Sequence, residues 1–255
     1  PRANKTDYFE KAEDVLFDAL ELLRTNPQRV SDYLFDAVIV DEAQDFKTDY
    51  WIPISDLLKD PINGVLYVFF DDNQRIYSQL SNIPISKEQA PIILTDNCRN
   101  TQAVFKVLQA YTKTSTAINC IGPEGRATEV KPATNESETQ KMLRVTLHEL
   151  INDKGALPSQ IVVLTPRKQE NSIWRDGATF GNYSLTWNLD NSGHSSIRVS
   201  TIHGFKGLES PIVILTELDQ AFAETREQLI YIGISRARNH LVIIGSLPAS
   251  SGNDG

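Results

Sequence analysis

Two carboxylates follow a short apolar run near the start of the chain. The run 37–40 is rich in β-branched residues, which suits a strand buried on both faces of a parallel sheet. It ends in Asp41 and Glu42, within the stretch Asp-Glu-Ala-Gln-Asp. An Asp at the end of a buried strand can hold Mg²⁺ beside nucleotide phosphates, and a neighbouring Glu can orient or deprotonate an attacking water. For an isolated pair of acids, a strand that ends in solvated carboxylates is the simpler interpretation. The segments that follow favour the chemical one.

A second apolar run also ends in acids and amides. Residues 65–70 read as a buried strand and are followed by Asp-Asp-Asn-Gln-Arg-Ile-Tyr. In open α/β sheets, ligands collect outside the carboxyl ends of the strands, so two such strands would build one site. Gln74 could align a water or sense a terminal phosphate there. Taken alone, Gln74 is equally a loop amide, and Tyr77 a core aromatic.

Basic residues lie at junctions later in the chain. Arg99 stands between a predicted strand and a predicted helix, where a guanidinium can pair with phosphate or with a local carboxylate. His203 and Lys206 follow a further strand between flanking glycines that allow close backbone approach. Individually they read as loop residues. Arg236 and Arg238 would individually be surface charges at a helix C-terminus, where cations are favoured.

Alternating strands and helices must position these side chains. Short β-branched runs predict buried strands, and apolar residues at helical spacing predict amphipathic helices. The predicted strands are 37–40, 65–70, 92–95, 128–130, 161–164, 197–201, 211–215 and 241–244. The predicted helices are 7–23, 50–58, 101–108, 136–150 and 224–237. Asn135 and Glu138 resemble a capping box, while residues 167–195 read as a helix and loops of uncertain form.

Composition sets limits on the class of protein. The chain has 255 residues, a formal net charge of -8 and no apolar run long enough to span a membrane, so no membrane association is expected. Its two cysteines, Cys98 and Cys120, form no disulfide framework, which indicates a reducing compartment, with a cytoplasmic location expected. Because the net charge is negative, binding of nucleic acid would need a local basic groove. The lack of a methionine near the start predicts a piece of a longer protein.

Five segments, in this order, resemble superfamily 1 helicases of the UvrD/Rep type. They correspond to motif II (the Walker B box, Asp41–Asp45), motif III (Asp71–Tyr77), motif IV (Asn97–Asn100), motif V (Val199–Glu209) and motif VI (Tyr231–Arg238). The resemblance implies an α/β, P-loop NTPase (RecA-like) fold with parallel sheets and flanking helices. Residues 1–99 would be the remainder of the first motor lobe, which is incomplete. Residues 100–255 would be a nearly complete second lobe, with Arg99 at the junction.

The resemblance also implies roles, with ATP and Mg²⁺ as cofactors. Asp41 would support Mg²⁺, Glu42 would activate the hydrolytic water, and Gln74 would sense the terminal phosphate. Arg99 and Arg236 would contact the phosphates from the two lobes, and Glu209 would meet the ribose. Tyr77, Thr201 and His203 would lie nearer the track of a single nucleic-acid strand, with DNA expected rather than RNA.

The chain departs from the family in two places. Cys98 stands where the family usually has a Tyr before the motif IV arginine, so the partner that would stack on the adenine is not predicted. No Gly-Lys dipeptide occurs, so the phosphate-binding loop that the family places upstream of motif II is missing. We therefore expect a C-terminal portion whose partner is the N-terminal part of the same protein. By itself it should not hydrolyse ATP, and its first sheet should have an unpaired edge.

The predicted function is that of the motor portion of an ATP-dependent DNA helicase or translocase moving on single-stranded DNA. One alternative is a helicase-like module that binds nucleic acid or protein without hydrolysis. The acids and arginines argue against it, because a scaffold needs none of them in these places. Another alternative, an unrelated α/β enzyme, would require five coincidental matches.

Overall fold

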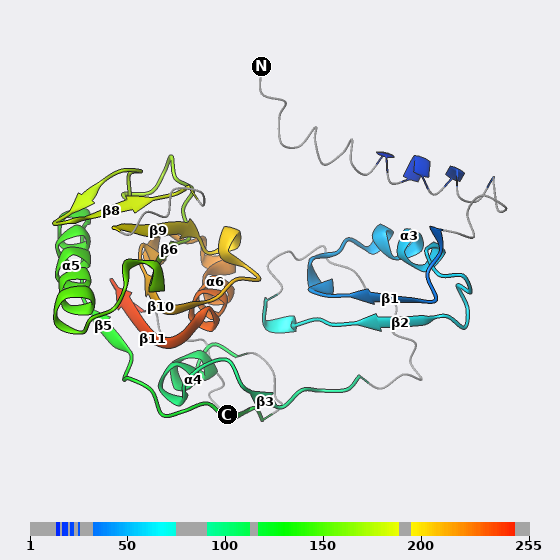
Figure 1. The fold of residues 1–255 in the computed structure, drawn as a ribbon, viewed down its shortest axis with the longest axis horizontal. Helices are drawn as coiled ribbons and strands as arrows, with labels where there is room; N and C mark the ends of the chain where they lie inside the picture. The colour runs from blue at the N-terminus through cyan, green and yellow to red at the C-terminus, as the bar shows by residue number, and fades with distance from the viewer. Residues whose placement is uncertain are drawn as a thin grey trace, which may run out of the picture. The chain divides into compact units, whose positions relative to one another are not determined.

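The computed structural model describes residues 33–74, 91–112, 117–188 and 195–247, together with the helical residues 14, 15, 17–19, 21, 22 and 25. The chain divides into two compact units, residues 1–91 and 92–255. Figure 1 shows both. The predicted N-terminal helix lies largely outside the described residues. Among those that are described, no helix is both long and apolar enough to cross a membrane.

The first unit contains a two-stranded parallel sheet. β1 (Ala37–Val40) pairs with β2 (Val65–Val68), residue for residue and without a bulge. Helix α3 (Trp51–Asp56) belongs to the same unit. The core consists of Val40, Ala43 and Trp51, with partly buried apolar residues around them. Trp51 is therefore a core residue.

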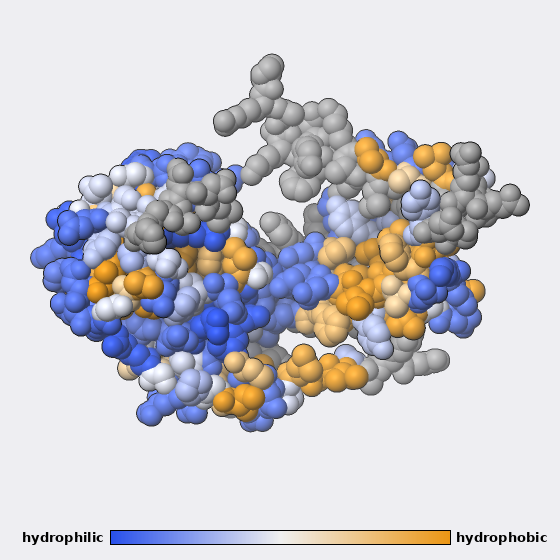
Figure 2. Space-filling model, in the orientation of Figure 1, coloured by the Kyte–Doolittle hydropathy of each residue, from blue (hydrophilic) through white to orange (hydrophobic). Residues whose placement is uncertain are grey.

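The other face of this sheet is exposed. Ile39 is 68% exposed and Tyr67 is 58% exposed, and Val65 and Phe69 are exposed with them. Hydrophobic side chains accordingly gather on the surface of this unit in Figure 2. The prediction that the run 37–40 is buried on both faces is thus wrong, because no described element covers the second face. Within the described residues each strand has a single strand partner. The unpaired edge of the first sheet stays a prediction.

The second unit is organised around a seven-stranded sheet of order β5-β11-β10-β6-β9-β8-β7. Neighbouring strands are parallel except for the antiparallel pair β7–β8. The strands are β5 (Glu129–Lys131), β6 (Ile161–Thr165), β7 (Thr179–Phe180), β8 (Tyr183–Thr186), β9 (Ser196–Thr201), β10 (Ser210–Leu215) and β11 (Ala237–Ile244). The predicted α/β class with parallel sheets and flanking helices is confirmed.

Helices cover this sheet and bury its central strands. α5 (Glu136–His148) contributes Leu143 and Leu147 to a core that includes Ile161 and Val163 of β6. α6 (Ala223–Ser235) packs on β10, β11 and α4 (Gln102–Gln109). Every residue of β6 is buried, as expected for a strand with both faces covered.

Two local predictions for this unit need correction. Residues 92–95 are not a strand, and Ile92, Ile93 and Leu94 are exposed, whereas β3 (Asp96–Asn97) pairs with β4 (Asn119–Cys120) just beyond them. Between β6 and β9 the described residues form β7, β8 and turns, and the predicted helix is absent from them. Isolated apolar residues there enter the core, such as Trp174, and they carry no helical periodicity.

The predicted helix starts are largely confirmed. Asn135 Oδ1 accepts a hydrogen bond from Glu138 N at 3.0 Å, as in a capping box. The Glu138 carboxylate turns instead to Thr134, accepting from its backbone N–H at 2.8 Å. Thr101 is the N-cap residue of α4 by position, although its hydroxyl donates to Asn239 O rather than capping the helix.

Candidate functional site

The parallel pairing of β1 and β2 brings the polar residues after both strands to one end of the sheet. Phe69 N donates to Val40 O at 2.8 Å, and Ala43 N donates to Phe69 O at 3.0 Å, so the backbone pairing continues past the strand ends. The two loops therefore leave the sheet side by side. This placement agrees with the prediction that both strands deliver their acids and amides at the same end.

Gln44 links the two loops directly. Its Nε2 donates to the Glu42 carboxylate, and its Oε1 accepts from Asp71 N at 3.0 Å. The side chain is fully buried, so these bonds form away from competing water. No role was predicted for Gln44. An amide between two acids in the same short stretch was the signal that could have indicated a bridging role.

Asp71 orders the second loop. Its Oδ1 accepts from Asn73 N at 2.9 Å, and its Oδ2 accepts from Gln74 Nε2 at 2.8 Å. Gln74 is buried and has its amide held in place. We call Asp41, Glu42, Gln44, Asp71 and Gln74 the acidic cluster.

Glu42 adopts a backbone conformation that a side chain of its kind rarely takes. Its φ is 52°, in the left-handed region, and its N–H donates to Asp41 Oδ1 at 2.8 Å. Such conformations cost roughly 1–2 kcal/mol for residues other than glycine. They persist where the surroundings hold them, often at functional sites. Here the bond from Gln44 to the Glu42 carboxylate helps to hold the turn.

The acidic cluster fits a magnesium ion only with help from a ligand. Among the described residues, no three His, Cys, Asp or Glu side chains lie close enough together to hold a metal. Mg²⁺ is commonly held by one or two carboxylates, with phosphates and waters as its other ligands. Asp41 is exposed at the end of β1 and can supply such a carboxylate.

In the second unit, Glu209 joins two arginines. Its Oε2 lies 3.3 Å from Arg99 Nε, and its Oε1 lies 3.3 Å from Arg238 Nη1. All three side chains are substantially exposed, so each pair stabilises the fold by only about 0–1 kcal/mol. A ligand could therefore open them at small cost. We call these residues the Glu209 cluster, and it contains two of the predicted ligand-binding residues, Arg99 and Glu209.

Asn100 fixes the segment that carries Arg99. It is buried, and its Nδ2 donates to Ser235 O at 3.3 Å and to Ala237 O at 2.6 Å. Thr101 N also donates to Arg238 O at 3.0 Å. Motif IV is thereby attached to the backbone of motif VI, which explains why Arg99 and Arg238 meet at the same carboxylate.

Arg236 lies in a different environment from Arg238. It is 2% exposed, and its guanidinium donates to Ile232 O at 3.2 Å and to Leu208 O at 3.3 Å. Arg238, two residues along, has a side chain that is 55% exposed. The guanidinium of Arg236 would have to leave these carbonyls to contact a phosphate, so its predicted role stays a prediction.

The residues predicted to lie near a nucleic-acid strand are partly described. Thr201 ends β9, and its Oγ1 accepts from Gly204 N at 2.8 Å. A Cβ added at Gly204 would lie 2.9 Å from that oxygen, so the turn that carries exposed His203 leaves no room for a side chain there. Tyr77 lies outside the described residues.

Sequence reasoning missed the buried carboxylate of Glu217. It follows β10, has a φ of 55°, and accepts from the hydroxyls of Thr165 at 2.7 Å and Ser172 at 2.6 Å. Ile173 N donates to its other oxygen at 3.2 Å. An acid two residues after a buried strand is close to the signal that drew attention to Asp41.

Comparisons with known proteins agree with the motif assignment in the second unit. Residues 196–244 match the family described as UvrD-like helicase C-terminal domain. A stretch of 53 residues is 43% identical to the ATP-dependent DNA helicase HMI1, mitochondrial, of Saccharomyces cerevisiae. That stretch covers 21% of this chain and 8% of the yeast protein.

Solved helicase structures are similar at low sequence identity. The C-terminal domain of a possible DNA helicase from Lactobacillus plantarum WCFS1 is 16% identical, with a TM-score of 0.45 over 60% of this chain and 90% of its own. PRRSV helicase is 14% identical, with a TM-score of 0.43 over 84% of this chain and 37% of its own. Arterivirus nonstructural protein 10, a helicase, is 18% identical, with a TM-score of 0.38 over 82% of this chain and 38% of its own.

The family match spans β9, β10, α6 and β11 and therefore contains motifs V and VI. It includes Thr201, His203, Glu209 and Arg236, which the motif assignment had singled out. Over residues 196–244 the chain thus resembles the UvrD-like helicase C-terminal domain, and its predicted relationship to UvrD-type helicases is confirmed.

Proposed function

We propose that this chain is the C-terminal motor portion of an ATP-dependent DNA helicase or translocase that moves on single-stranded DNA. The observation that carries the proposal is the acidic cluster. Two parallel strands end in the motif II and motif III residues, and Gln44 ties Glu42 to the start of the second loop. A scaffold needs neither the strained backbone at Glu42 nor this buried amide.

The residues of the two units have complementary tasks in phosphoryl transfer, which depends on alignment and charge neutralisation. Mg²⁺, held in part by Asp41, would neutralise charge on the phosphates. Glu42 orients or deprotonates the attacking water, and Gln74 senses the terminal phosphate. Arg99 and Arg236 contact the phosphates, and Glu209 meets the ribose. Tyr77, Thr201 and His203 contact the single strand.

The partners follow from the same proposal. The N-terminal part of the same protein would supply the phosphate-binding loop, so this chain alone does not turn over ATP. Nucleic-acid binding would come from phosphate contacts and base stacking. A reducing compartment such as the cytoplasm suits the two cysteines, neither of which is in a disulfide.

ATPase assays with and without single-stranded DNA test the proposal. The chain alone should show no turnover above background. In the full-length protein, Glu42→Gln should lower kcat by roughly 10²–10⁴, the usual contribution of a general base. Asp49→Asn is the matched control, because Asp49 is an exposed acid in the same unit outside the acidic cluster.

Two results would contradict the proposed function. Robust turnover by the chain alone, abolished by Glu42→Gln, would show that the phosphate cradle is complete without further residues. A full-length protein that binds single-stranded DNA but never hydrolyses ATP would instead favour the non-hydrolysing binding module.

A further inference from the structure

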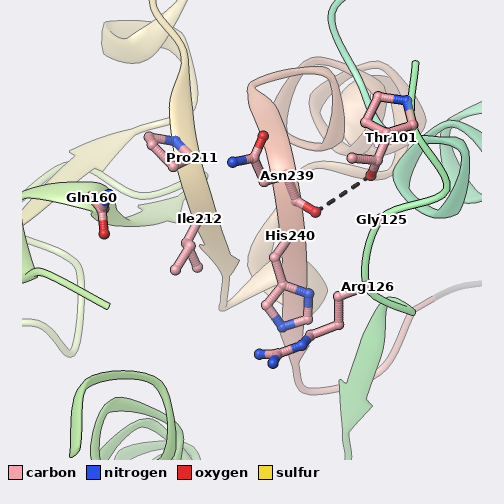
Figure 3. A pocket seen from close by; sticks show the side chains of 9 residues that line it. Thr101, Gly125, Arg126, Gln160, Pro211, Ile212, Asn239 and His240 are labelled. Carbon is pink, nitrogen blue, oxygen red and sulfur yellow. Dashed lines mark hydrogen bonds between the residues drawn. The ribbon is translucent and has the colours of Figure 1, made fainter. Parts of the chain in front are cut away.

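A pocket of about 440 Å³ lies in the second unit, lined by side chains to which the proposed function gives no role. Pro211 and Ile212 of β10 and His240 of β11 line it, together with Pro123 and Arg126 from the loop before β5. Figure 3 shows the imidazole of His240 and the guanidinium of Arg126 beside each other in this pocket. The register between β10 and β11 shifts at this point, from Ser210↔Ala237 to Ile212↔His240. Such bulges re-aim side chains, often beside functional sites.

His240 is buried in the pocket without a satisfactory hydrogen bond. The residue is 4% exposed, and neither ring nitrogen has a hydrogen-bond partner among the described residues. Nε2 lies 3.4 Å from Glu129 Oε1, an ion-pair distance but not a hydrogen bond, and Nδ1 has no hydrogen-bond partner among the described residues. A buried polar group left unsatisfied costs about 1–3 kcal/mol. A ligand that hydrogen-bonds to the ring would recover part of that cost.

Arg126 supplies the charge at this site. It is exposed and forms no ion pair with any residue that the structure describes. The loop that carries it is packed tightly on the start of α4. Gly125 has a φ of 74°, and a Cβ there would lie 2.4 Å from Thr101 Cβ. Gln102 N donates to Pro123 O at 2.8 Å. The position of the Arg126 backbone is therefore set before any ligand binds.

The neighbouring carboxylate does not cancel this charge. Glu129 is the acid nearest to His240, but Lys154 Nζ lies 3.3 Å from its Oε1 and Lys131 Nζ lies 3.5 Å from its Oε2. Partial burial opposes ionisation of Glu129, but the hydrogen bond and charge of Lys154, with Lys131 and His240, lower its pKa. Lys131 also pairs with Glu149, so the two lysines balance two carboxylates, and the guanidinium of Arg126 is the charge left over at the pocket.

We propose that this pocket binds a phosphate group, with Arg126 as the charged donor and His240 as the buried hydrogen-bond partner. A tetrahedral phosphate can present separate oxygens to a guanidinium and to an imidazole at the same time. The pocket is larger than a phosphate alone requires. Its apolar wall of Pro123, Pro211 and Ile212 suits the body of a phosphate ester such as a nucleotide. The ester can be a free mononucleotide or a unit of a nucleic-acid strand.

NMR of the histidine side chains tests the site directly. The chain has four histidines, so their ring ¹H–¹⁵N signals can be resolved, and His240→Gln assigns the ring in question. Titration with inorganic phosphate at constant ionic strength should move the His240 signals saturably. Arg126→Gln should weaken phosphate binding roughly ten- to a hundredfold, as loss of a charge-assisted hydrogen bond would. Arg175→Gln, at an exposed arginine elsewhere in this unit, should leave binding unchanged.

Two further probes separate the sources of the phosphate. If a DNA oligonucleotide without terminal phosphates shifts the His240 ring at lower concentration than inorganic phosphate, the ligand is a strand. If only inorganic phosphate and thymidine 5′-monophosphate shift the His240 signals, the ligand is a free phosphate ester. The proposal is overturned if none of the three probes moves the His240 signals, or if Arg126→Gln responds as the unaltered chain does. Both readings use a chain that keeps His240, and His240→Gln serves only to assign its ring. If that variant does not fold, substituting the other three histidines one at a time assigns the ring by elimination.

Discussion

At the scale of single residues, Glu217 is the buried acid whose surroundings are best defined. It is 6% exposed, and its carboxylate holds the hydroxyls of Thr165 and Ser172 and the backbone of Ile173. Arg167 Nη1 approaches the same carboxylate at 4.0 Å. Because Thr165 ends β6 and the others follow it, Glu217 anchors the loop after β6 to the end of β10.

Replacing this carboxylate should loosen the loop. We expect Glu217→Gln to lower the free energy of unfolding by about 1–3 kcal/mol, because one amide oxygen cannot accept from all of these donors. Urea unfolding followed by the fluorescence of Trp174, which lies next to this loop, measures the loss. Glu170→Gln, at an exposed acid of the same loop, is the control and should be neutral.

A second substitution weighs the carboxylate against the strained backbone. Glu217→Gly relieves the left-handed conformation but also removes the acceptor. If Glu217→Gly proved clearly more stable than the unaltered chain, relief of the backbone would outweigh the lost acceptor, and the carboxylate would not be the anchor.

His240 should give the second unit a pH-dependent stability. Burial lowers its pKa, as do the charges of Arg126 and Lys154, while Glu129 acts in the opposite direction. The unfolded chain then binds more protons than the folded chain between the folded pKa and about 6.5. The free energy of unfolding should therefore fall as the pH drops through that interval and level off below it. The stability that neutral, buried His240 contributes is fully present above the pKa of this residue in the unfolded chain.

Urea midpoints measured from about pH 7 to about pH 5 test this dependence. His240→Gln should flatten the slope. His148→Gln is the control, since the side chain of His148 is 65% exposed, and it should leave the slope unchanged. A slope that survives in His240→Gln would assign the effect to other groups.

At the scale of elements, the exposed face of the β1–β2 sheet is the feature most open to association. Ile39 and Tyr67 stand on it, and the described residues offer no cover. Exposed apolar strands with free edges tend to pair with other chains. We expect Ile39→Glu to reduce self-association without loss of fold, because the side chain already faces solvent. Light scattering after size exclusion measures this.

Val40→Glu is the matched comparison at the next position of β1. Val40 is buried in the core of this unit, so a carboxylate there should destabilise it by several kcal/mol. If Ile39→Glu behaved like Val40→Glu, the second face of the sheet would be covered in solution.

The elements also show what a sequence can predict. β1 and β6 have the same local signature, a short run of β-branched residues, and both were predicted as buried strands. Only β6 is buried on both faces, because α5 and its neighbours cover it. Burial depends on partners that the run itself does not encode. The prediction of a strand at residues 92–95 fails for the same reason, because an apolar run without a neighbouring strand has nothing to pair with.

The residues of the candidate site were predictable where a side chain able to do chemistry follows a predicted strand. An acid or amide directly after an apolar run indicated Asp41, Glu42 and Gln74, and the paired strands bring their loops together. The contacts that hold these groups were not predictable, because Gln44 and Asn100 bond to segments far along the chain. Hydrogen bonds of that kind leave no pattern in the local sequence.

At the scale of the whole molecule, the two units differ in how much core each possesses. The second unit packs α5 and six strands of its sheet, from β7 at one edge to β11, into one cluster of buried residues. The first unit buries Val40, Ala43 and Trp51 at its centre, and among the described residues its sheet has two strands. A two-stranded sheet with so small a core is marginal by itself.

The second unit should therefore fold alone, while the first should not. We expect a fragment of residues 92–247 to unfold cooperatively in urea, with dispersed amide signals, because its core contacts lie within that range. Its midpoint should match the transition of the same unit in the whole chain, followed by Trp174 and Trp187. A fragment of residues 33–91 should lack dispersed signals, since its exposed apolar face would remain in water. If the 92–247 fragment were molten while the whole chain was not, the stability of the second unit would have to come from residues of the first.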